Sequence, residues 1–412
     1  MLKSIGRAAR DQVRSLTRVV QGRTPAPVPL TSMTLDADDV EIARRWLSER
    51  SGWADESIVR AFESEFAKWN GSRYAFAFAA GRVALSACVD ALGLSAGDEV
   101  ILPGYTCVVV PNALRFAGVA PEYADIELDT FGLDADCARR KLTPNTRGIL
   151  LHHLFGLVCR DFRQLLELAE AHDIPVIEDC AHATGASFGG RKVGNYGEVG
   201  FYSSERSKIF NTIQGGIVVT NNASIAQRIA DFQARAPMQE AYVTERQLYN
   251  VLLEYYQCKG AQRLWSSSVA ELSLGHKRIR TTTAEEERGV KPADYGCRMA
   301  PPIAALAMNQ LGKVDRYNAR RREIAARWAS WCAASGYSPP LVLSDSVPVF
   351  LRYPVLVEPE KKQDPAWAEK ELDVKLGVWF VSHVHPTNRQ VHGCSKAAEA
   401  VARNVNLPCL DG

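Results

Sequence analysis

The chain has 412 residues, of which 46% are apolar and 23% are charged, and its formal net charge is +2. This length suffices for a large domain and a smaller one, and the composition is that of a globular protein. The near-neutral charge excludes a strongly basic chain, so no nucleic-acid partner is expected. The ten cysteines form no C-x-x-C pair. This spacing predicts reduced thiols in a cytoplasmic protein rather than a disulfide framework or a metal site.

Residues 1–30 are expected to form a basic N-terminal arm that ends in a proline-rich linker. Four arginines recur at helical spacing in this arm, and three prolines follow them. The arginines are Arg7, Arg10, Arg14 and Arg18. A basic amphipathic helix predicts either peripheral contact with anionic lipid or a targeting segment. A helix with a solvated basic face, or a disordered tail, is the alternative interpretation.

The next part of the chain alternates between helical and strand patterns. The expected order is helix 36–53, helix 57–69, strand 74–80, a helix from Gly81, strand 97–103, a helix through 113–117, strand 147–153, helix 162–172 and strand 174–179. Strands separated by helices favour a mostly parallel, doubly wound sheet. Ligands bind at the carboxyl ends of the strands in such sheets, and Asp179 stands at one of these ends.

Lys208 is the most informative residue of the chain because of its surroundings. It follows a serine-containing turn that includes Ser203, and it precedes a Gly-Gly pair that opens the apolar strand 215–220. A lysine amine, a strand-end carboxylate and a turn hydroxyl are the groups that pyridoxal 5'-phosphate chemistry requires. The amine forms a Schiff base, the carboxylate of Asp179 keeps the pyridine nitrogen protonated, and hydroxyl and amide groups hold the phosphate.

At these residues the chain resembles the pyridoxal-phosphate-dependent sugar aminotransferases of the DegT/StrS family, which have the aspartate aminotransferase-like fold (fold type I). The similarity runs from about residue 30 to 222 and resumes at about 294, and it is most specific at 176–186 and 194–220. It implies an α/β fold with a large domain, built on a mostly parallel seven-stranded sheet, and a smaller α+β C-terminal domain. The implied reaction transfers an amino group from an amino acid, glutamate, to a nucleotide-linked keto or aldo sugar. Such a reaction serves surface polysaccharide or glycosylated metabolite biosynthesis.

The resemblance divides the chain into three further parts after the arm. They are a large cofactor-binding domain at 31–230, an insertion atypical of the family at 231–292, and a small domain at 293–412. Long insertions are often functional binding loops. We expect this one to cover the entrance for the acceptor sugar, with Arg278 and Arg280 meeting a diphosphate. A decorative helix on the dimer surface is the alternative.

The resemblance also assigns the site residues. Catalytic roles fall on Lys208, Asp179 and His182, with His182 either near the phenolic oxygen of the cofactor or simply a buried structural histidine. The phosphate is expected at Ser203 and at the helix start formed by Gly81 and Arg82, where free amide groups favour an anion. The further assignments are Tyr105 and Cys107 at the cofactor ring, Arg298 reaching the cofactor phosphate of the partner subunit in a homodimer, and His383 and His385 in the substrate pocket.

Two alternative functions remain open. The first is sugar dehydration or deoxygenation on the same fold, in which the family typically replaces the Schiff-base lysine by histidine; the retention of Lys208 argues against it. The second is a catalytically silent binding or regulatory protein. Arg82 stands where the family has a phosphate-binding threonine, and Cys107 stands where the family usually has an aromatic residue that stacks on the cofactor ring; both replacements would permit this alternative.

Overall fold

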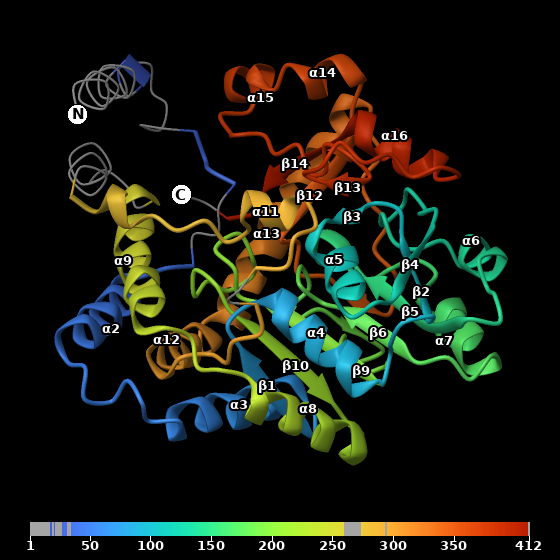
Figure 1. The fold of residues 1–412 in the computed structure, drawn as a ribbon. Coiled ribbons are helices and arrows are strands. Elements are labelled where there is room, and N and C mark those ends of the chain that lie inside the picture. Colours follow the sequence, from blue (N-terminus) through green and yellow to red (C-terminus); the bar gives the residue numbers. More distant parts are fainter. Residues whose placement is uncertain are drawn as a thin grey trace.

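The computed structural model describes residues 17, 18, 20, 27–30, 34–258, 273–292 and 295–410. Most of the predicted basic arm, with Arg7, Arg10 and Arg14, lies outside these residues. The described chain forms a large sheet-containing layer and a smaller lobe above it, coloured orange to red in Figure 1. None of the described helices combines the length and the apolar character needed to cross a bilayer.

A seven-stranded sheet forms the centre of the large domain, as predicted. Its strand order is β1-β10-β9-β6-β5-β2-β4 (Figure 1). The bounds are β1 Tyr74–Phe78, β2 Glu99–Pro103, β4 Ala120–Ala124, β5 Thr146–His152, β6 Val176–Asp179, β9 Val199–Ser203 and β10 Gly216–Thr220. The strands from β9 to β4 are mutually parallel, whereas β10 is antiparallel to both β9 and β1. The mostly parallel sheet inferred from the alternating pattern is therefore confirmed.

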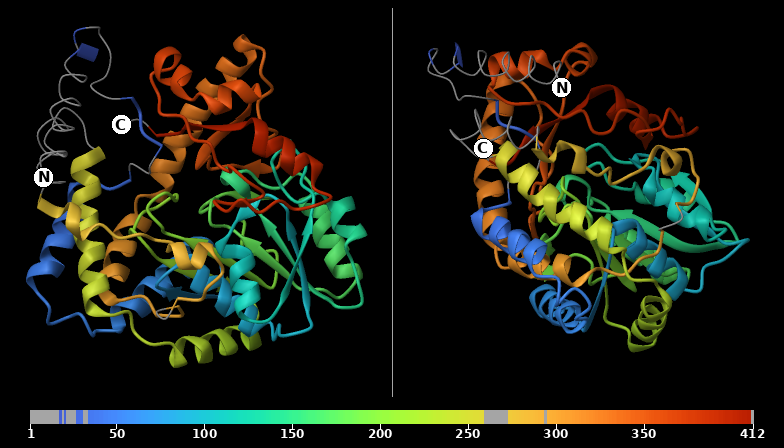
Figure 2. Two further views of the ribbon diagram at one scale, coloured as in Figure 1. Left: turned by 45° about the horizontal axis from the view of Figure 1, so that its top comes forward. Right: turned by 60° about the vertical axis from the view of Figure 1, so that its left-hand side comes forward.

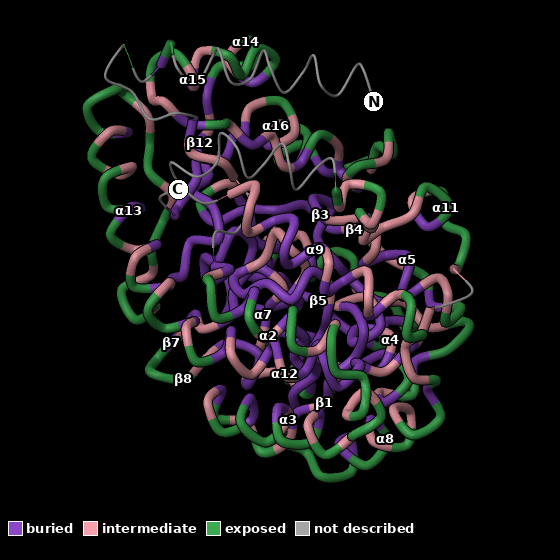
Figure 3. The backbone as a smooth tube through the Cα atoms, turned by 90° about the vertical axis from the view of Figure 1, so that its left-hand side faces the viewer, coloured by how far each residue is buried: buried purple, intermediate pink, exposed green. Residues whose placement is uncertain are grey.

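Helices cover both faces of this sheet because consecutive strand residues point to opposite sides. In β5, Ile149 and Leu151 pack in one apolar cluster and Leu150 in the other, and all three are buried. One cluster receives α4 Gly81–Ala91, α5 Val109–Phe116 and α8 Ala223–Arg235; the other receives α3 Ser57–Asn70, α7 Phe162–Ala171 and α12 Pro301–Leu311. Figure 3 shows the buried sheet enclosed by helices with exposed outer faces. The strands therefore form near-continuous apolar runs, as buried parallel strands do.

The smaller lobe has its own apolar core. Its elements are α13 Val314–Ser335, β12 Arg352–Leu356, α14 Pro359–Gln363, α15 Ala366–Glu371, α16 Ser395–Arg403 and β14 Asn404–Pro408. Strands β12 and β14 pair in antiparallel fashion, and Tyr353, Val355 and Leu407 are buried in this core. Helix α12 instead buries Ile303 and Leu306 beside Phe62 in the sheet cluster. The chain therefore passes from one core to the other at α13, after the domain boundary expected at residue 293.

A long helix forms the first half of the insertion. Helix α9 Ala241–Cys258 lies beside α2 Ala37–Ser48 (Figure 2), while α8 runs across the boundary expected at 230/231. The buried α9 side chains Leu248 and Val251 pack in the sheet cluster, so this helix is part of the large-domain core. After residues 259–272, which lie outside the description, the chain returns through the turn η2 Gly275–Lys277 and the short helix α11 Ala284–Glu287.

Shorter strands complete the architecture. They are β3 Thr106–Cys107, β7 Ser187–Phe188, β8 Arg191–Lys192, β11 Ser346–Val347 and β13 Val384–His385; α6 Ala135–Arg140 is a short peripheral helix. Strand β13 of the smaller lobe pairs in parallel with β3 of the large domain, so that His385 lies opposite Cys107. This pairing joins the two lobes at the carboxyl edge of the sheet.

Candidate active site

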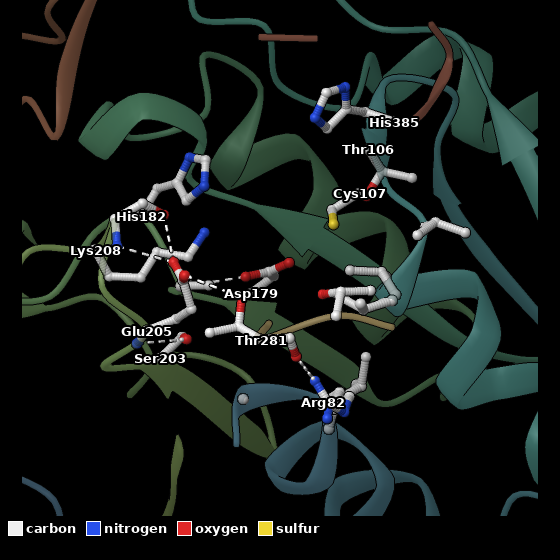
Figure 4. Close-up of a pocket in the computed structure, with 18 of the residues that line it drawn as sticks. Arg82, Thr106, Cys107, Asp179, His182, Ser203, Glu205, Lys208, Thr281 and His385 are labelled. Atoms are coloured by element: carbon white, nitrogen blue, oxygen red, sulfur yellow. Dashed lines mark hydrogen bonds between the residues drawn. The ribbon is translucent and has the colours of Figure 1, made fainter. Parts of the chain in front are cut away.

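A cavity of about 360 Å³ lies at the carboxyl ends of the parallel strands, where the doubly wound topology places ligands. The strand ends of β5, β6 and β9 line it, together with the start of α4, the loop that carries Lys208, and residues 379, 380, 385 and 386 of the smaller lobe. Figure 4 shows Asp179, Lys208 and Ser203 gathered in this cavity, with Cys107 and His385 across from them. Asp179, the strand-end residue singled out in the sequence, lines this cavity.

The two carboxylates at the end of β6 have different surroundings because they alternate along the strand. Glu178 accepts backbone hydrogen bonds from Gly194 at 2.7 Å and Tyr196 at 2.6 Å, and its side chain fastens the turn before β9. Asp179 lines the cavity, 9% exposed, and accepts a hydrogen bond from the Ala181 amide at 3.0 Å. Burial raises the pKa of Asp179 to about 6, and the nearby Lys208 opposes this shift. Asp179 is thus the carboxylate available to a ligand.

Lys208 lies in the loop between β9 and β10 and borders the cavity, half-buried. Its amide donates to the Glu205 carbonyl at 2.8 Å, which tightens the turn around it. Desolvation by burial lowers the pKa of the Lys208 ammonium, while Glu205 and Asp179 oppose this effect. A lowered pKa increases the neutral fraction of the amine, and only the neutral amine is a nucleophile.

The Gly-Gly pair after Lys208 has a steric reason. A Cβ at Gly216 would clash with the carbonyl of Ala80, so β10 begins directly against the turn that precedes α4. A Cβ at Gly81 would come within 3.0 Å of the Ser203 Cβ and 3.1 Å of its Oγ. The first amide groups of α4 and the Ser203 hydroxyl therefore share one narrow space. Helix-start amides have no acceptor within the helix, and they suit an anion such as phosphate.

Ser203, rather than Ser204, faces the cavity. The Ser204 hydroxyl is fully buried and lies 2.6 Å from the Thr212 hydroxyl inside the loop. This arrangement agrees with the choice of Ser203 for the phosphate. Arg82 also lines the cavity, but its guanidinium is turned to the insertion, where it donates to the Thr281 carbonyl and lies 3.2 Å from the Glu286 carboxylate. Only the Arg82 main chain is left for the phosphate.

His182 is buried beside Lys208 and stacks on Trp379, with ring centroids 5.4 Å apart and an interplanar angle of 16°. The Phe155 amide donates to its Nδ1 at 3.3 Å, which places the proton of the neutral ring on Nε2. Burial lowers the pKa of His182 well below its usual range, and Lys208 and Arg352 add to this effect. A neutral His182 therefore offers Nε2–H as a donor in the cavity wall.

Asparagine side chains hold both backbone groups of Trp379, its amide and its carbonyl. Its amide donates to Asn406 Oδ1 at 3.0 Å, and its carbonyl accepts from Asn404 at 3.1 Å. The next residue, Phe380, donates to the Tyr105 hydroxyl at 2.7 Å and accepts from Lys362 at 2.9 Å. This network fixes the wall of the cavity contributed by the smaller lobe. The guanidinium of Arg352 lies 3.4 Å from the centroid of the Trp379 ring, and Lys208 Nζ lies 5.2 Å from it.

Of the predicted residues from the 105–107 loop and the two histidines, Tyr105 and His383 do not line the cavity. Tyr105 is fully buried between Phe131 and Phe380 and does not line the cavity, because its hydroxyl supports the 379–380 segment. Cys107 does line it, beside Thr106. His385 lines it as well, whereas His383 lies behind it, with Nε2 at 3.3 Å from the Cys394 carbonyl.

The three predicted arginine contacts, Arg298, Arg278 and Arg280, do not line the cavity of their own subunit. The backbone of Arg298 forms an isolated antiparallel β-bridge with Phe78, and its guanidinium forms an ion pair with Glu56 at 3.0 Å. Arg298 does not line the cavity of its own subunit. Arg278 and Arg280 are exposed on the insertion and do not line it either. Instead, Thr281, Thr282 and Glu287 of the same segment do.

Sequence reasoning missed Trp379, Glu205, Arg352 and the cavity-lining threonines of the insertion. The sequence carried one signal for Trp379, its position close before the two histidines already assigned to the pocket. Neither Arg352 nor Thr281 stands in a motif that marks a site residue. These residues reach the site through tertiary packing.

The residues present fit pyridoxal 5'-phosphate. The narrow space between Gly81 and Ser203 suits the phosphate, Asp179 the ring nitrogen and Lys208 the aldehyde carbon. Ala181 and Cys107 also line the cavity. The fold and this site define a pyridoxal-phosphate-dependent protein of the aspartate aminotransferase-like class.

Comparison with known proteins agrees with this class. The model of the DegT/DnrJ/EryC1/StrS aminotransferase family matches residues 36–412. The chain belongs to this family. It is 32% identical over 310 residues to the L-glutamine:2-deoxy-scyllo-inosose aminotransferase of Streptomyces kanamyceticus, over 75% of this chain and 64% of that protein. It is 33% identical over 280 residues to the GDP-perosamine synthase of Escherichia coli O157:H7, over 68% of this chain and 63% of that protein. The chain thus spans slightly less than two thirds of either relative.

Solved structures share the fold. An aminotransferase from Psychrobacter cryohalolentis superimposes with a TM-score of 0.70 at 24% identity, covering 91% of this chain and 93% of that chain. The GDP-4-keto-6-deoxy-D-mannose-3-dehydratase of E. coli superimposes with a TM-score of 0.71 at 18% identity, covering 94% and 96%. Both confirm the fold type I architecture predicted from the sequence.

Proposed function

We propose that this protein is an aminotransferase that moves an amino group from an amino acid to the carbonyl carbon of a sugar or sugar-like ring. The observation that carries the proposal is the meeting of Lys208, Asp179 and the space between Gly81 and Ser203 in one cavity. Membership of an aminotransferase family supports the reaction type.

The residues divide the work of such a reaction. Bound pyridoxal phosphate supplies an electron-accepting ring that carries the amino group between two half-reactions. Lys208 Nζ would hold the cofactor covalently at rest; once released, it would move a proton from the donor carbon to the cofactor in the first half-reaction and from the cofactor to the acceptor carbon in the second. Asp179 would accept the hydrogen bond of the ring nitrogen and stabilise its positive charge. Ser203 and the first amides of α4 hold the phosphate and set the orientation of the ring.

A nucleotide-linked keto sugar is the acceptor that we favour. The similarity to GDP-perosamine synthases supports it. Arg278 and Arg280, exposed on the insertion close in sequence to the cavity-lining Thr281, supply charge for a diphosphate. Relatives named as aminotransferases of scyllo-inosose and 2-deoxy-scyllo-inosose favour a keto-cyclitol as the second candidate. Because those names include L-glutamine, L-glutamine is the alternative to glutamate as the amino donor.

We further propose a homodimer in which Arg298 of the partner subunit completes the phosphate site. The support is the family resemblance of the segment that carries Arg298, whose counterparts reach the cofactor phosphate of the neighbouring subunit. Arg298 does not line the cavity of its own subunit. A dehydratase activity is disfavoured because Lys208 is present where dehydrating family members typically carry histidine.

The first test addresses the cofactor. Lys208→Ala should abolish the linkage that borohydride reduces onto the protein, while the phosphate contacts still retain the cofactor noncovalently. Lys68→Ala, at an exposed lysine of α3, is the matched control and should keep the linkage. A reducible linkage that survives in Lys208→Ala would refute the assignment, and a purified protein that binds no pyridoxal phosphate would favour a silent homologue.

The second test addresses the reaction. The protein loaded with the aminated cofactor is mixed separately with GDP-4-keto-6-deoxy-D-mannose, scyllo-inosose and 2-deoxy-scyllo-inosose, and the return of the pyridoxal spectrum is followed. Glutamate and L-glutamine are compared in the opposite half-reaction. We expect the GDP-sugar to react and Arg278→Ala/Arg280→Ala to raise its KM without changing the donor half-reaction. Reaction of an inosose alone would replace the first candidate by the second.

A further inference from the structure

The insertion segment 279–287 is fastened to the active site by side chains of three separate elements. From α4, Arg82 donates to the Thr281 carbonyl and lies 3.2 Å from Glu286, whose side chain is fully buried. From α5, Asn112 donates to the Glu286 carbonyl at 2.6 Å. From the loop that carries Lys208, Arg206 donates to the Ile279 carbonyl at 2.9 Å. These contacts fix the segment at both ends and in the middle.

The segment also touches the loop of the catalytic lysine directly. The Thr281 hydroxyl donates to Glu205 Oε1 at 3.2 Å, and Glu205 holds the turn that presents Lys208 (Figure 4). Thr281, Thr282 and Glu287 line the cavity. Segment 279–287 is therefore a wall of the active site rather than a loop above it.

The chemistry of this wall selects a ligand class. It offers two hydroxyls and one carboxylate to the cavity, and within the described part of the chain no ion pair or hydrogen bond engages the Glu287 carboxylate. The two nearby guanidinium groups are engaged by carboxylates, Arg82 by Glu286 at 3.2 Å and Arg206 by Glu254 at 3.0 Å. Such a wall accepts hydrogen bonds from hydroxyl groups and repels anions.

We propose that Thr282 and Glu287 recognise the ring hydroxyls of the carbonyl acceptor, a neutral polyhydroxylated ring, and that Glu286 is a positioning residue that fixes this wall through Arg82. The inference rests on the proposed aminotransfer and assigns the acceptor side of it to the insertion. A charged part of the substrate, such as a diphosphate, lies outside this wall.

The test separates the two half-reactions in Thr282→Val, Glu287→Gln and Glu286→Gln. Glu285→Gln, an exposed neighbour on α11, is the control. The acceptors are the GDP-keto sugar and the two inososes, which differ from each other by one hydroxyl group. We expect Thr282→Val and Glu287→Gln to raise the acceptor KM by up to about tenfold, the scale of one lost hydrogen bond. The donor half-reaction should stay within about twofold, and the control should match the wild type.

Direct binding gives a readout independent of turnover. Calorimetry with Lys208→Ala protein holding the aminated cofactor should show the same loss of acceptor affinity in Glu287→Gln and none in Glu285→Gln. Equal slowing of both half-reactions would overturn the proposal, because the wall would then serve the cofactor. Unchanged kinetics in both half-reactions would overturn it as well.

A failure of the proposed function is recognised separately. If the wild type reacts with none of the three acceptors, hydrogen exchange still tests the wall. Loading with pyridoxal phosphate should slow amide exchange in residues 279–287 of the wild type and not in Glu286→Gln. Identical exchange with and without cofactor in the wild type would show that the segment is no part of the site.

Discussion

Replacing Asp179 by asparagine should stabilise the cofactor-free protein while weakening cofactor binding. The raised pKa of about 6, against an ordinary value of 3.8, means that the folded protein keeps a proton that the unfolded chain has already lost. Stability of the wild type therefore falls as the pH rises from about 4 to about 6. A difference of about two pKa units corresponds to about 3 kcal/mol at neutral pH. Asparagine removes this charge and keeps an oxygen that accepts from the Ala181 amide.

The measurement is a comparison of urea unfolding midpoints for cofactor-free wild type and Asp179→Asn at pH 4, 5, 6 and 7. The two proteins differ in one titrating group, so the remaining pH dependence cancels in the difference. We expect the advantage of the variant to grow through this range and then level off. Pyridoxal phosphate, in contrast, should stabilise the wild type more than the variant. A stability difference that does not change with pH would show that the Asp179 carboxylate is not desolvated in the cofactor-free protein. It would refute the reasoning that this carboxylate stays buried and desolvated until a cationic ring nitrogen binds.

Three further predictions concern other parts of the site. Gly81→Ala should lower cofactor affinity by at least tenfold in a binding titration, because the new Cβ would lie 3.0 Å from the Ser203 Cβ; unaltered affinity would move the phosphate elsewhere. Mixing inactive Lys208→Ala and Arg298→Ala subunits should restore part of the activity through one intact hybrid site, and a fully active monomer in sedimentation would contradict the shared site. Burial lowers the pKa of Lys362 to about 8, so the stability of the wild type relative to Lys362→Met should rise between pH 8 and pH 10 in thermal unfolding; a flat difference would show that the ammonium is solvated.

The sheet and the centre of the site were predictable because their signals are local. The strand ending in Asp179 and the glycines around Lys208 each reflect a backbone requirement within a few residues, and Gly216 shows the reason in its approach to Ala80. The outer parts of the site were not predictable in this way. Tyr105 stands in the expected loop, yet its hydroxyl is taken by the Phe380 amide, a contact between residues 275 positions apart. Trp379, the residue before Phe380, is held in the cavity wall by Asn404 and Asn406.

Arg82, at the position where the family has threonine, predicts which residues vary together among related chains. A helix-start position that binds phosphate through its main chain leaves the side chain free to change, and here that side chain holds Glu286 and the Thr281 carbonyl of an added segment. The two changes are linked, since Arg82 lies 3.2 Å from the buried Glu286 carboxylate. Among homologous chains, a basic residue at the position of Arg82 should therefore occur together with an acid at the position of Glu286. Chains without the insertion should keep a small hydroxyl residue at the helix start.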